Sequence, residues 1–425
     1  MYKKILPFFL DASQNSIIRQ SFLFFSATMI LNLTAFFYHF YMGRVLGPAD
    51  YGILGTLLSL HYLTGVLLNV IQTSITKFTA SYKAHGSYDI LGYLLHRSFY
   101  RLSLYGFLAF LLFLLISIPL SPFLSLPFFY LFLLSLSLPF LFLLPLTRGV
   151  LQGLQRFSSL GINLIVEGVT KLLFGILLVY LGFRVSGAVL GIVLSFIVAF
   201  FFSLSPLHGI RSSKKVDLPR RSLYLYAFPV ALTLLSLTAF YSLDIIFVKR
   251  FLSDVDAGLY VAAALLGKIV FFASLAIPLI MFPKSAELQA LKKSGKPVLL
   301  KSLAFVSCIS LAVLVSYLLF PRFVISLLFG GGEYYIISPY LWIFALAFWF
   351  YSLSYTLAMY FLSLRLLSYL YLLFFFNIFQ VFALLLFHSS LFIVALVLLF
   401  TFFFLFLFLF LYTLKIWNSL LPKPL

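Results

Sequence analysis

Long apolar segments fill almost the whole of this 425-residue chain and leave only short polar stretches between them. Hydrophobic residues make up 64% of the chain and charged residues only 9%, which is too little polar surface for a soluble domain. A helix needs about 20 mostly apolar residues to cross a bilayer, and the segments are continuously apolar rather than alternating. The sequence therefore predicts an all-α polytopic membrane protein with about twelve transmembrane helices, at 21–43, 52–75, 99–119, 127–146, 159–182, 185–206, 223–248, 258–282, 298–320, 336–363, 366–387 and 390–414.

The basic residues indicate how these helices are oriented. The formal net charge is +19, and the Lys and Arg residues concentrate in alternate loops. If the N-terminus is inside, 22 of the 29 basic residues lie in inner segments and 5 in outer loops. The positive-inside rule then predicts a multi-pass protein of the cytoplasmic (inner) membrane with both termini in the cytoplasm. Because topology explains the charge, nucleic acid is not an expected partner.

The longest polar stretch in the middle of the chain is HGIRSSKKVDLPRRS, at 208–222. It separates six predicted spans from six others, so we expect an N-terminal six-helix bundle at 1–207, a basic cytoplasmic linker at 208–222 and a C-terminal six-helix bundle at 223–425. No loop could hold a soluble catalytic domain, and motifs such as HExxH or GxSxG do not occur. The single cysteine, Cys308, excludes a disulfide framework. We expect no enzyme activity, no catalytic residue, no cofactor and no metal site.

A weak internal repeat relates the two predicted bundles. GRVLGPADYGILG, at 43–55, is echoed 206 positions later by KRFLSDVDAGLYV, at 249–261. At an offset of 210 positions, LQGLQRF, at 151–157, is echoed by FLSLRLL, at 361–367. Both echoes occupy equivalent places in the order of the spans. Because each half has an even number of spans, the halves should share one orientation and form a parallel repeat, as in some transporters.

Several of these strings, taken in order, resemble a known group of transporters. The resemblance rests on GRVLGPADYGILG at 43–55, RGVLQGLQRF at 148–157, the segment 228–268, PKSAEL at 283–288 and ISLLFGGGEY at 325–334. Together they are similar to the polysaccharide-export branch of the multidrug/oligosaccharidyl-lipid/polysaccharide (MOP) flippase superfamily. The likeness is greatest to Wzx-like oligosaccharide repeat-unit flippases and more distant to MurJ and the MATE transporters.

That resemblance implies a MOP/MATE-like fold and a function in polysaccharide biosynthesis. Its members translocate polyprenyl-pyrophosphate-linked oligosaccharide repeat units across the cytoplasmic membrane by alternating access of two bundles. The implied partners are this lipid-linked substrate, membrane lipids, a coupling H⁺ or Na⁺, a polysaccharide polymerase and glycosyltransferases. Two alternatives stay open. A MATE-like ion-coupled exporter of small molecules would favour an anionic cavity, and an integral-membrane glycan-transfer enzyme would favour a large outer loop or an acidic motif.

Few ionisable residues lie within predicted spans, where charge is costly and normally faces a protein interior or a watery cavity. Lys268 is near the middle of its span and too deep to reach the interface. It either contacts substrate in the cavity or pairs with Asp244. Asp244 lies nearer the outer end and is a candidate for a coupling ion, an ion pair or solvent exposure. Glu167 and Lys171 are four residues apart on one helical face, so they either pair with each other or line the cavity.

Polar residues form a second group of candidates. Most polar side chains inside a membrane hydrogen-bond between helices, and the alternative is a place in the substrate cavity. Arg148 and Arg156, at the predicted inner mouth, either determine topology or attract the anionic headgroup. Asn377 lies 210 positions after Glu167, as a symmetry mate would. The complete set of substrate-cavity candidates is Lys268, Glu167, Lys171, Asn32, Asn69, Gln72 and Asn377.

Overall fold

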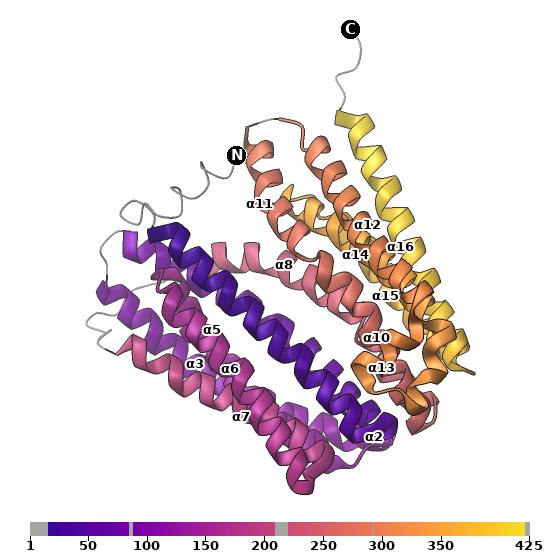
Figure 1. The fold of residues 1–425 in the computed structure, drawn as a ribbon. Helices are drawn as coiled ribbons and strands as arrows, with labels where there is room; N and C mark the ends of the chain where they lie inside the picture. Colours follow the sequence, from indigo (N-terminus) through magenta and orange to yellow (C-terminus); the bar gives the residue numbers. More distant parts are fainter. Residues whose placement is uncertain (1–15, 85–87, 209–219, 292, 421–425) are drawn as a thin grey trace, which may run out of the picture. The chain divides into compact units, whose positions relative to one another are not determined.

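The computed structural model describes residues 16–84, 88–208, 220–291 and 293–420, and Figure 1 shows how their helices are connected. Throughout these residues the regular structure is helical and there is no strand. The predicted all-α fold class is therefore confirmed. Both predicted cytoplasmic termini, at 1–15 and 421–425, and most of the predicted linker lie outside the described residues.

In the described part of the chain, ten helical stretches are long and apolar enough to cross a membrane. Two of them are unusually long, Leu23–Lys83 and Phe157–Leu207, and each contains one glycine whose backbone is not helical. Gly47 has φ 75° and Gly182 has φ 91°, a region that glycine enters without a steric penalty. If these two stretches are divided at their glycines, the ten become twelve and match the predicted spans in order. The number of membrane crossings itself stays a prediction.

The residue contacts divide the chain into two compact units. The first unit comprises Met1–Tyr41, Leu68–Leu120 and Pro127–Arg220, and the second comprises Met42–Leu67, Ser121–Leu126 and Arg221–Leu425. Helix α2, Ser16–Ala84, therefore passes from the first unit into the second and back again. The segment that joins predicted spans 1 and 2 thus packs with residues from the other half of the sequence. The predicted bundle boundaries stay a proposal.

The first unit is held together by helices that pack closely around α7. Its elements after α2 are α3 (Tyr88–Phe123), α4 (Phe128–Ser135), α5 (Leu138–Gly153), α6 (Phe157–Leu178), η2 (Val179–Phe183), α7 (Arg184–Leu204) and η3 (Ser205–Leu207). Helix α7 packs against α4, α5 and α6. Small residues permit this, because a Cβ atom on Gly191 would lie 2.7 Å from the Cα of Gly175.

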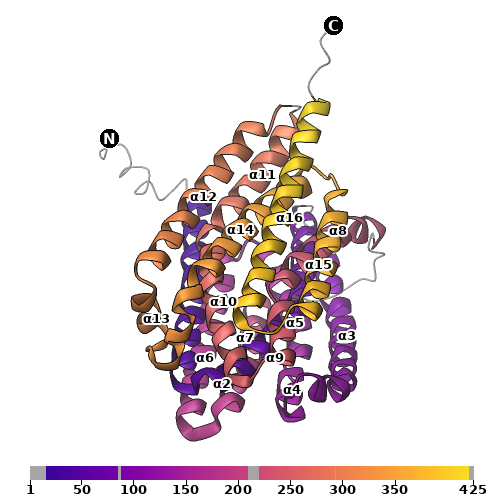
Figure 2. The same cartoon turned by 90° about the vertical axis from the view of Figure 1, so that its right-hand side faces the viewer.

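The second unit is arranged around α14. Its elements are α8 (Arg220–Phe240), α9 (Leu243–Phe251), α10 (Asp254–Ser274), α11 (Ala276–Ala290), α12 (Lys296–Leu319), α13 (Pro321–Phe329), η4 (Gly332–Tyr340), α14 (Leu341–Ser363), α15 (Tyr369–Leu386) and α16 (Leu391–Leu420). Helix α14 packs against α10, α11, α12 and α16, and Figure 2 shows it among them. Most of its side chains are buried, so it forms the core of this unit.

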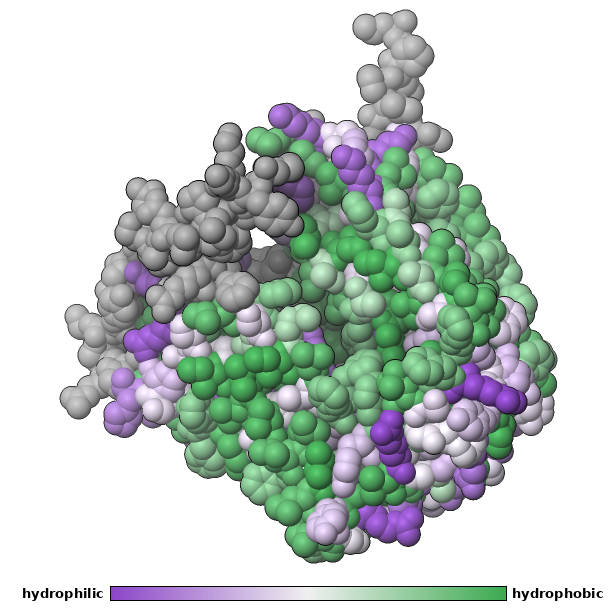
Figure 3. All heavy atoms as spheres, viewed as in Figure 1, coloured by the Kyte–Doolittle hydropathy of each residue, from purple (hydrophilic) through white to green (hydrophobic). Residues whose placement is uncertain are grey.

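Hydrophobic side chains also cover much of the outside. Figure 3 shows one face of the molecule on which hydrophobic residues predominate over hydrophilic ones. Large exposed side chains include Leu115 on α3, Phe305 on α12 and Phe382 on α15, each at least 60% exposed. Such a surface is stable in lipid and would aggregate in water, which agrees with a multi-pass membrane protein.

The backbone after α5 is repeated after α14. Gln155 and Arg365, which are 210 positions apart, both have a positive φ, of 61° and 56°. The residues that follow them close equivalent hydrogen bonds, since Arg156 N–H donates to the Leu151 carbonyl at 2.8 Å and Leu366 N–H to the Phe361 carbonyl at 3.0 Å. A positive φ is uncommon for these residue types. Its occurrence at both positions supports the predicted duplication.

Side chains from the second span of each half cap these same helix ends. Lys83 Nζ donates to the Leu154 carbonyl at 2.9 Å, and Gln289 Nε2 donates to the Leu364 carbonyl, also at 2.9 Å. The donors are 206 positions apart and the acceptors 210, the two offsets found in the sequence. A helix leaves its last carbonyls without partners, so each cap satisfies one of them.

The other echo also has a structural counterpart, within the second unit. A Cβ atom on Gly52 would lie 2.8 Å from the backbone N of Gly258, and one on Gly55 would lie 3.1 Å from the Cβ of Val261. In both pairs the partners are 206 positions apart. Contact between equivalent residues arises when a two-fold axis passes between them. This contact further supports the predicted duplication.

The contact should make Gly258 intolerant of any side chain. A Cβ atom there would collide with the Pro48 carbonyl, so Gly258→Ala should lower the free energy of unfolding by about 1–3 kcal/mol. The control is Gly65→Ala, where nothing lies within 4 Å and alanine should stabilise the helix by up to about 1 kcal/mol. Thermal unfolding of both purified variants in detergent measures the difference. Equal melting temperatures would contradict the tight contact.

Candidate functional site

The predicted ionisable candidates lie in two groups, one in each unit. In the second unit, Lys268 on α10 has only 5% of its surface exposed. Its Nζ lies 5.0 Å from the ring centroid of Tyr241 and 6.0 Å from that of Tyr62. A cation over an aromatic ring is stabilised by the electrons of the ring face. No carboxylate of the described residues lies at ion-pair distance from this ammonium group.

Asp244 lies near Lys268 and is fully buried, with none of its surface exposed. It occupies the first turn of α9, where the helix dipole favours a carboxylate. Its Oδ2 accepts a hydrogen bond from the Tyr260 hydroxyl at 2.9 Å, and its Oδ1 has no hydrogen-bond partner among the described residues. Asp244 and Lys268 attract each other electrostatically. Lys249 makes its ion pair with Asp254, so it does not neutralise Asp244.

Tyrosines and a phenylalanine surround this pair. Tyr241 packs against Tyr351, with ring centroids 5.9 Å apart, and Phe271 packs against Tyr355 at 5.0 Å. These rings come from the turn after α8, from α10 and from α14. The sequence analysis did not single them out, because nothing distinguishes them among the 26 tyrosines and 55 phenylalanines of the chain.

In the first unit, Arg148 organises a second polar group. Its guanidinium forms an ion pair with Glu167 at 2.5 Å and donates from Nε to Asn163 Oδ1 at 2.7 Å. Asn163 Nδ2 in turn donates to the Ala199 carbonyl at 2.6 Å, which connects α5, α6 and α7. Arg148 is only 9% exposed, so the structure places it inside this unit. The ion-pair partner of Glu167 is therefore Arg148.

Lys171 lies one turn beyond Glu167 on α6. Its Nζ stands over the ring of Tyr38 at 5.5 Å, and the Tyr38 hydroxyl donates to the Ala188 carbonyl at 2.8 Å. Glu167 attracts Lys171 electrostatically but already pairs with Arg148. When all three groups are ionised, this unit contains two buried or half-buried cations and one anion. The surplus positive charge suits an anionic ligand.

The other predicted candidates are dispersed. Gln72 Nε2 donates to Gln152 Oε1 at 3.0 Å, between α2 and α5. Asn377, on α15, donates to the Ser236 carbonyl at 3.2 Å and to the Leu373 carbonyl at 2.8 Å. These two side chains bridge or brace helices. The remaining candidates are exposed: Asn32 and Asn69 on α2, and Arg156, which donates to the Pro206 carbonyl.

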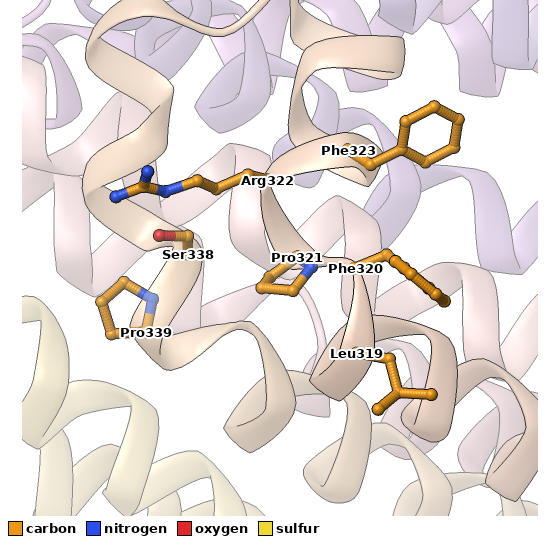
Figure 4. Close-up of a pocket in the computed structure, with 7 residues that line it drawn as sticks. All are labelled: Leu319, Phe320, Pro321, Arg322, Phe323, Ser338 and Pro339. Carbon is orange, nitrogen blue, oxygen red and sulfur yellow. The ribbon is translucent and has the colours of Figure 1, made fainter.

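Among the described residues, no three His, Cys, Asp or Glu side chains are grouped so that they could hold a metal ion. An open pocket of about 420 Å³ lies where α12, α13 and η4 meet. Figure 4 shows Arg322 extending to one side of it, towards Ser338, while Phe320 and Phe323 point to the other. Its lining contains none of the predicted site residues.

Comparisons with known proteins place the chain in context. Residues 17–289 match the family described as polysaccharide biosynthesis protein. An uncharacterized membrane protein of Methanocaldococcus jannaschii is 28% identical over 280 residues, which cover 61% of this chain and 66% of that protein, slightly less than two thirds of its length.

Solved structures share the fold at low sequence identity. An inward-facing multidrug resistance MATE family transporter of the MOP superfamily matches with a TM-score of 0.78 at 15% identity, over 92% of this chain and 94% of that one. The lipid II flippase MurJ matches with a TM-score of 0.73 at 14% identity, over 93% and 87%. A MOP superfamily transporter of Pyrococcus furiosus matches with a TM-score of 0.65 at 17% identity, over 96% of both chains.

The buried ion pair between Arg148 and Glu167 should be required for the stability of the first unit. Glu167→Ala leaves the Arg148 guanidinium buried without its counter-charge, which should lower the free energy of unfolding by about 3–5 kcal/mol. The double variant Arg148→Met with Glu167→Leu removes both charges and should recover most of that loss. Thermal unfolding in detergent measures both variants. A double variant no more stable than Glu167→Ala would contradict the pairing.

Proposed function

Because this chain belongs to the polysaccharide biosynthesis protein family of MOP flippases, we propose that it translocates polyprenyl-pyrophosphate-linked oligosaccharide repeat units across the cytoplasmic membrane. It is a multi-pass membrane protein and a transporter rather than an enzyme. The family implies a lipid-linked substrate and contact with membrane lipids. In our proposal the halves of the chain alternate between access from inside and from outside.

The observation that carries the proposal is the sign of the buried charge. Among the predicted site residues, Arg148, Lys171 and Lys268 supply three cations, while Glu167 and Asp244 supply two anions. Arg148 is engaged by Glu167, which leaves Lys171 and Lys268 over tyrosine rings without a direct carboxylate partner in the described part of the chain. Ammonium groups in a low-dielectric setting bind a pyrophosphate through strong charge-assisted hydrogen bonds. We propose these two lysines as substrate contacts.

The aromatic residues around Lys268 fit the other part of such a substrate. Tyrosine offers an apolar ring face and a hydroxyl group, so it can contact the C–H face and the hydroxyl groups of a sugar at the same time. Tyr241 and Tyr62 stand beside the ammonium group of Lys268. A glycan joined to a pyrophosphate presents both chemistries next to each other.

A MATE-like exporter of small molecules is the second candidate function. The structural likeness to a MATE family transporter supports the shared fold. In the Pyrococcus furiosus transporter, the reverse polarity of the binding pocket suggests a different function of that protein. By the same reasoning, a surplus of buried cations here favours an anionic substrate. The likeness to MurJ supports a flippase that handles a lipid-linked substrate.

Coupling to an H⁺ or Na⁺ gradient is part of the proposal, and Asp244 is the residue to which we assign it. Its Oδ1 is buried and finds no hydrogen-bond partner in the described part of the chain, so it is an acceptor that a proton or cation would satisfy. Further buried oxygen atoms without partners lie on α8, α15 and between α8 and α9: those of Ser236, Ser242, Asn377 and Gln380. A polysaccharide polymerase and glycosyltransferases remain the proposed functional partners, and both termini remain assigned to the cytoplasm.

Removing the charge of Lys268 tests the substrate role. Lys268→Ala should lower translocation of lipid-linked oligosaccharide in proteoliposomes by about one to two orders of magnitude, the value of a charged hydrogen bond. Its melting temperature in detergent is measured beside translocation, so that loss of transport is not mistaken for loss of the fold. Lys301→Ala, which removes an exposed lysine on α12, is the matched control. Unchanged translocation by Lys268→Ala would refute the assigned contact.

Neutralising Asp244 tests the coupling role. Asp244→Asn keeps the size of the side chain but cannot bind a proton or cation as a carboxylate does. Translocation by this variant should no longer respond to an imposed H⁺ or Na⁺ gradient, whereas wild-type translocation should. Asp256→Asn, at an exposed position in the first turn of α10, is the control. If both variants respond to the gradient as the wild type does, Asp244 does not carry the coupling ion.

A further inference from the structure

The pocket where α12, α13 and η4 meet contains none of the residues assigned to the proposed function, and it lies where the chain leaves the membrane. Helix α12 is one of the stretches long and apolar enough to cross a membrane, and the next such stretch begins at Gly332. The 24 residues of α12 extend about 36 Å, slightly more than the hydrocarbon core of about 30 Å. Helix α13 therefore lies at the membrane surface, on the predicted outer side.

Helix α13 has the two faces of a helix that lies along a membrane surface. Ile325 and Phe329 are buried in the second unit, whereas Phe323 and Leu327 are each more than half exposed. The members of each pair are four positions apart, so each pair lies on one face of the helix. An amphipathic helix at a membrane surface places its exposed apolar side chains between the lipid headgroups and the acyl chains. The exposed face of α13 is thus suited to contact lipid.

Hydrogen bonds to the segment that joins the first two predicted spans hold α13 and η4 in place. The Arg44 guanidinium donates to the carbonyls of Ser326 and Leu327, in the last turn of α13. Carbonyls at the end of a helix lack partners within it and attract a cation. On η4, the Tyr334 hydroxyl donates to the Gly43 carbonyl at 2.8 Å. Because both elements are fastened to the same short segment, the pocket beside them is a fixed feature of the second unit.

The pocket combines a free guanidinium group with apolar walls. Its polar side chains are those of Arg322 and Ser338, and the first extends towards the second (Figure 4). Neither side chain forms a hydrogen bond or an ion pair with any described residue. The other described residues that line the pocket are leucine, phenylalanine and proline. The guanidinium group therefore has all its donors available to an anion.

An apolar surface leads away from the pocket along α12. Leu311, Val315 and Leu318 are all exposed, and their spacing of four and three residues places them on one face of the helix. Leu319, which is 65% exposed, continues this surface into the lining of the pocket. A ligand with an anionic head and hydrocarbon chains would match both the guanidinium group and this surface.

We propose that the pocket binds a phospholipid with a net negative charge, whose phosphate contacts Arg322 and Ser338 and whose acyl chains follow α12. A guanidinium group binds a phosphate through two parallel hydrogen bonds. The described lining contains no carboxylate, so the ammonium group of a zwitterionic lipid would find no counter-charge there. The volume of about 420 Å³ lies within the range of ligand pockets.

The topology of the chain does not account for Arg322. Basic residues concentrate in the predicted inner segments, and Arg322 is one of only five in the predicted outer loops. Binding of a lipid phosphate gives this arginine a role that the positive-inside rule does not. The lipid site goes beyond the proposed function and is independent of what the protein translocates.

Thermal unfolding of the purified protein in detergent tests the ligand class. Dioleoyl phosphatidylglycerol should raise the melting temperature more than dioleoyl phosphatidylcholine, because a ligand that binds only the folded state stabilises it by mass action. Inorganic phosphate at the same concentration should have no effect, since it lacks acyl chains. An equal effect of the two lipids would overturn the proposal, and so would a full effect of inorganic phosphate.

Variants of Arg322 test the contact itself. Arg322→Ala should require about tenfold more phosphatidylglycerol for the same shift, the value of a charged hydrogen bond, and Arg322→Lys should require less than Arg322→Ala. Without lipid, Arg322→Ala should unfold at the wild-type temperature, because this side chain is exposed and has no partner among the described residues. Arg250→Ala removes another exposed arginine of the second unit, outside the pocket, and should respond as the wild type does. A wild-type response of Arg322→Ala would refute the contact.

Native mass spectrometry provides a second measurement that does not depend on unfolding. After purification with phosphatidylglycerol, the wild type and Arg250→Ala should retain one more lipid molecule than Arg322→Ala. Ser338→Ala, which removes the hydroxyl group on the opposite side of the pocket, should retain an intermediate amount. Equal numbers of retained lipids in the wild type and Arg322→Ala would overturn the proposal.

Discussion

The close approach of two backbone segments at Gly52 and Gly258 is the constraint on which the arrangement of the second unit depends. Any side chain at Gly258 would meet the Pro48 carbonyl, so residues 43–55 can pack against α10 only if this position remains glycine. The bend that brings residues 43–55 to α10 occurs at Gly47, where φ is 75°. From this contact follow the burial of Tyr51, the position of Arg44 at the end of α13 and the membership of residues 42–67 in the second unit.

Buried charge obeys a similar constraint in both units. A charge removed from water must be paired or hydrogen-bonded, or it destabilises the fold. Arg148 meets this requirement with Glu167 and Asn163, and Asn163 is satisfied in turn by a backbone carbonyl. Lys171 and Lys268 meet it only in part, each through a tyrosine ring and the attraction of a nearby carboxylate that is not its ion-pair partner. A buried charge without a full set of partners is typical of a functional site, where a bound ligand supplies the missing partner. For this reason we proposed the two lysines as substrate contacts.

The sequence predicted the helices well, because each depends on a local property. Apolar runs of about 20 residues predict spans, and glycines at 47 and 182 mark the breaks within the two longest helical stretches. Side-chain partners depend on contacts between distant segments. The spacing of Glu167 and Lys171 favours an ion pair on one helix. Instead, Arg148 from another helix forms the ion pair with Glu167, because its guanidinium can donate two hydrogen bonds to a carboxylate. Asn163, a polar residue one turn before Glu167, was the sequence signal that could have revealed the Arg148 site. No sequence signal distinguishes the tyrosines around Lys268 from the other tyrosines of the chain.

The fold alone does not determine what is transported. A MATE family transporter and the flippase MurJ both share most of this chain's fold, so a common scaffold accommodates different substrates. The difference must then lie in the side chains that a substrate meets, and above all in their charge. Buried ammonium groups would hinder an exporter of cations. Two like charges repel each other much more strongly in a low-dielectric interior than in water. In the function we propose, Lys171 and Lys268 would therefore both disfavour a cationic substrate and favour a pyrophosphate.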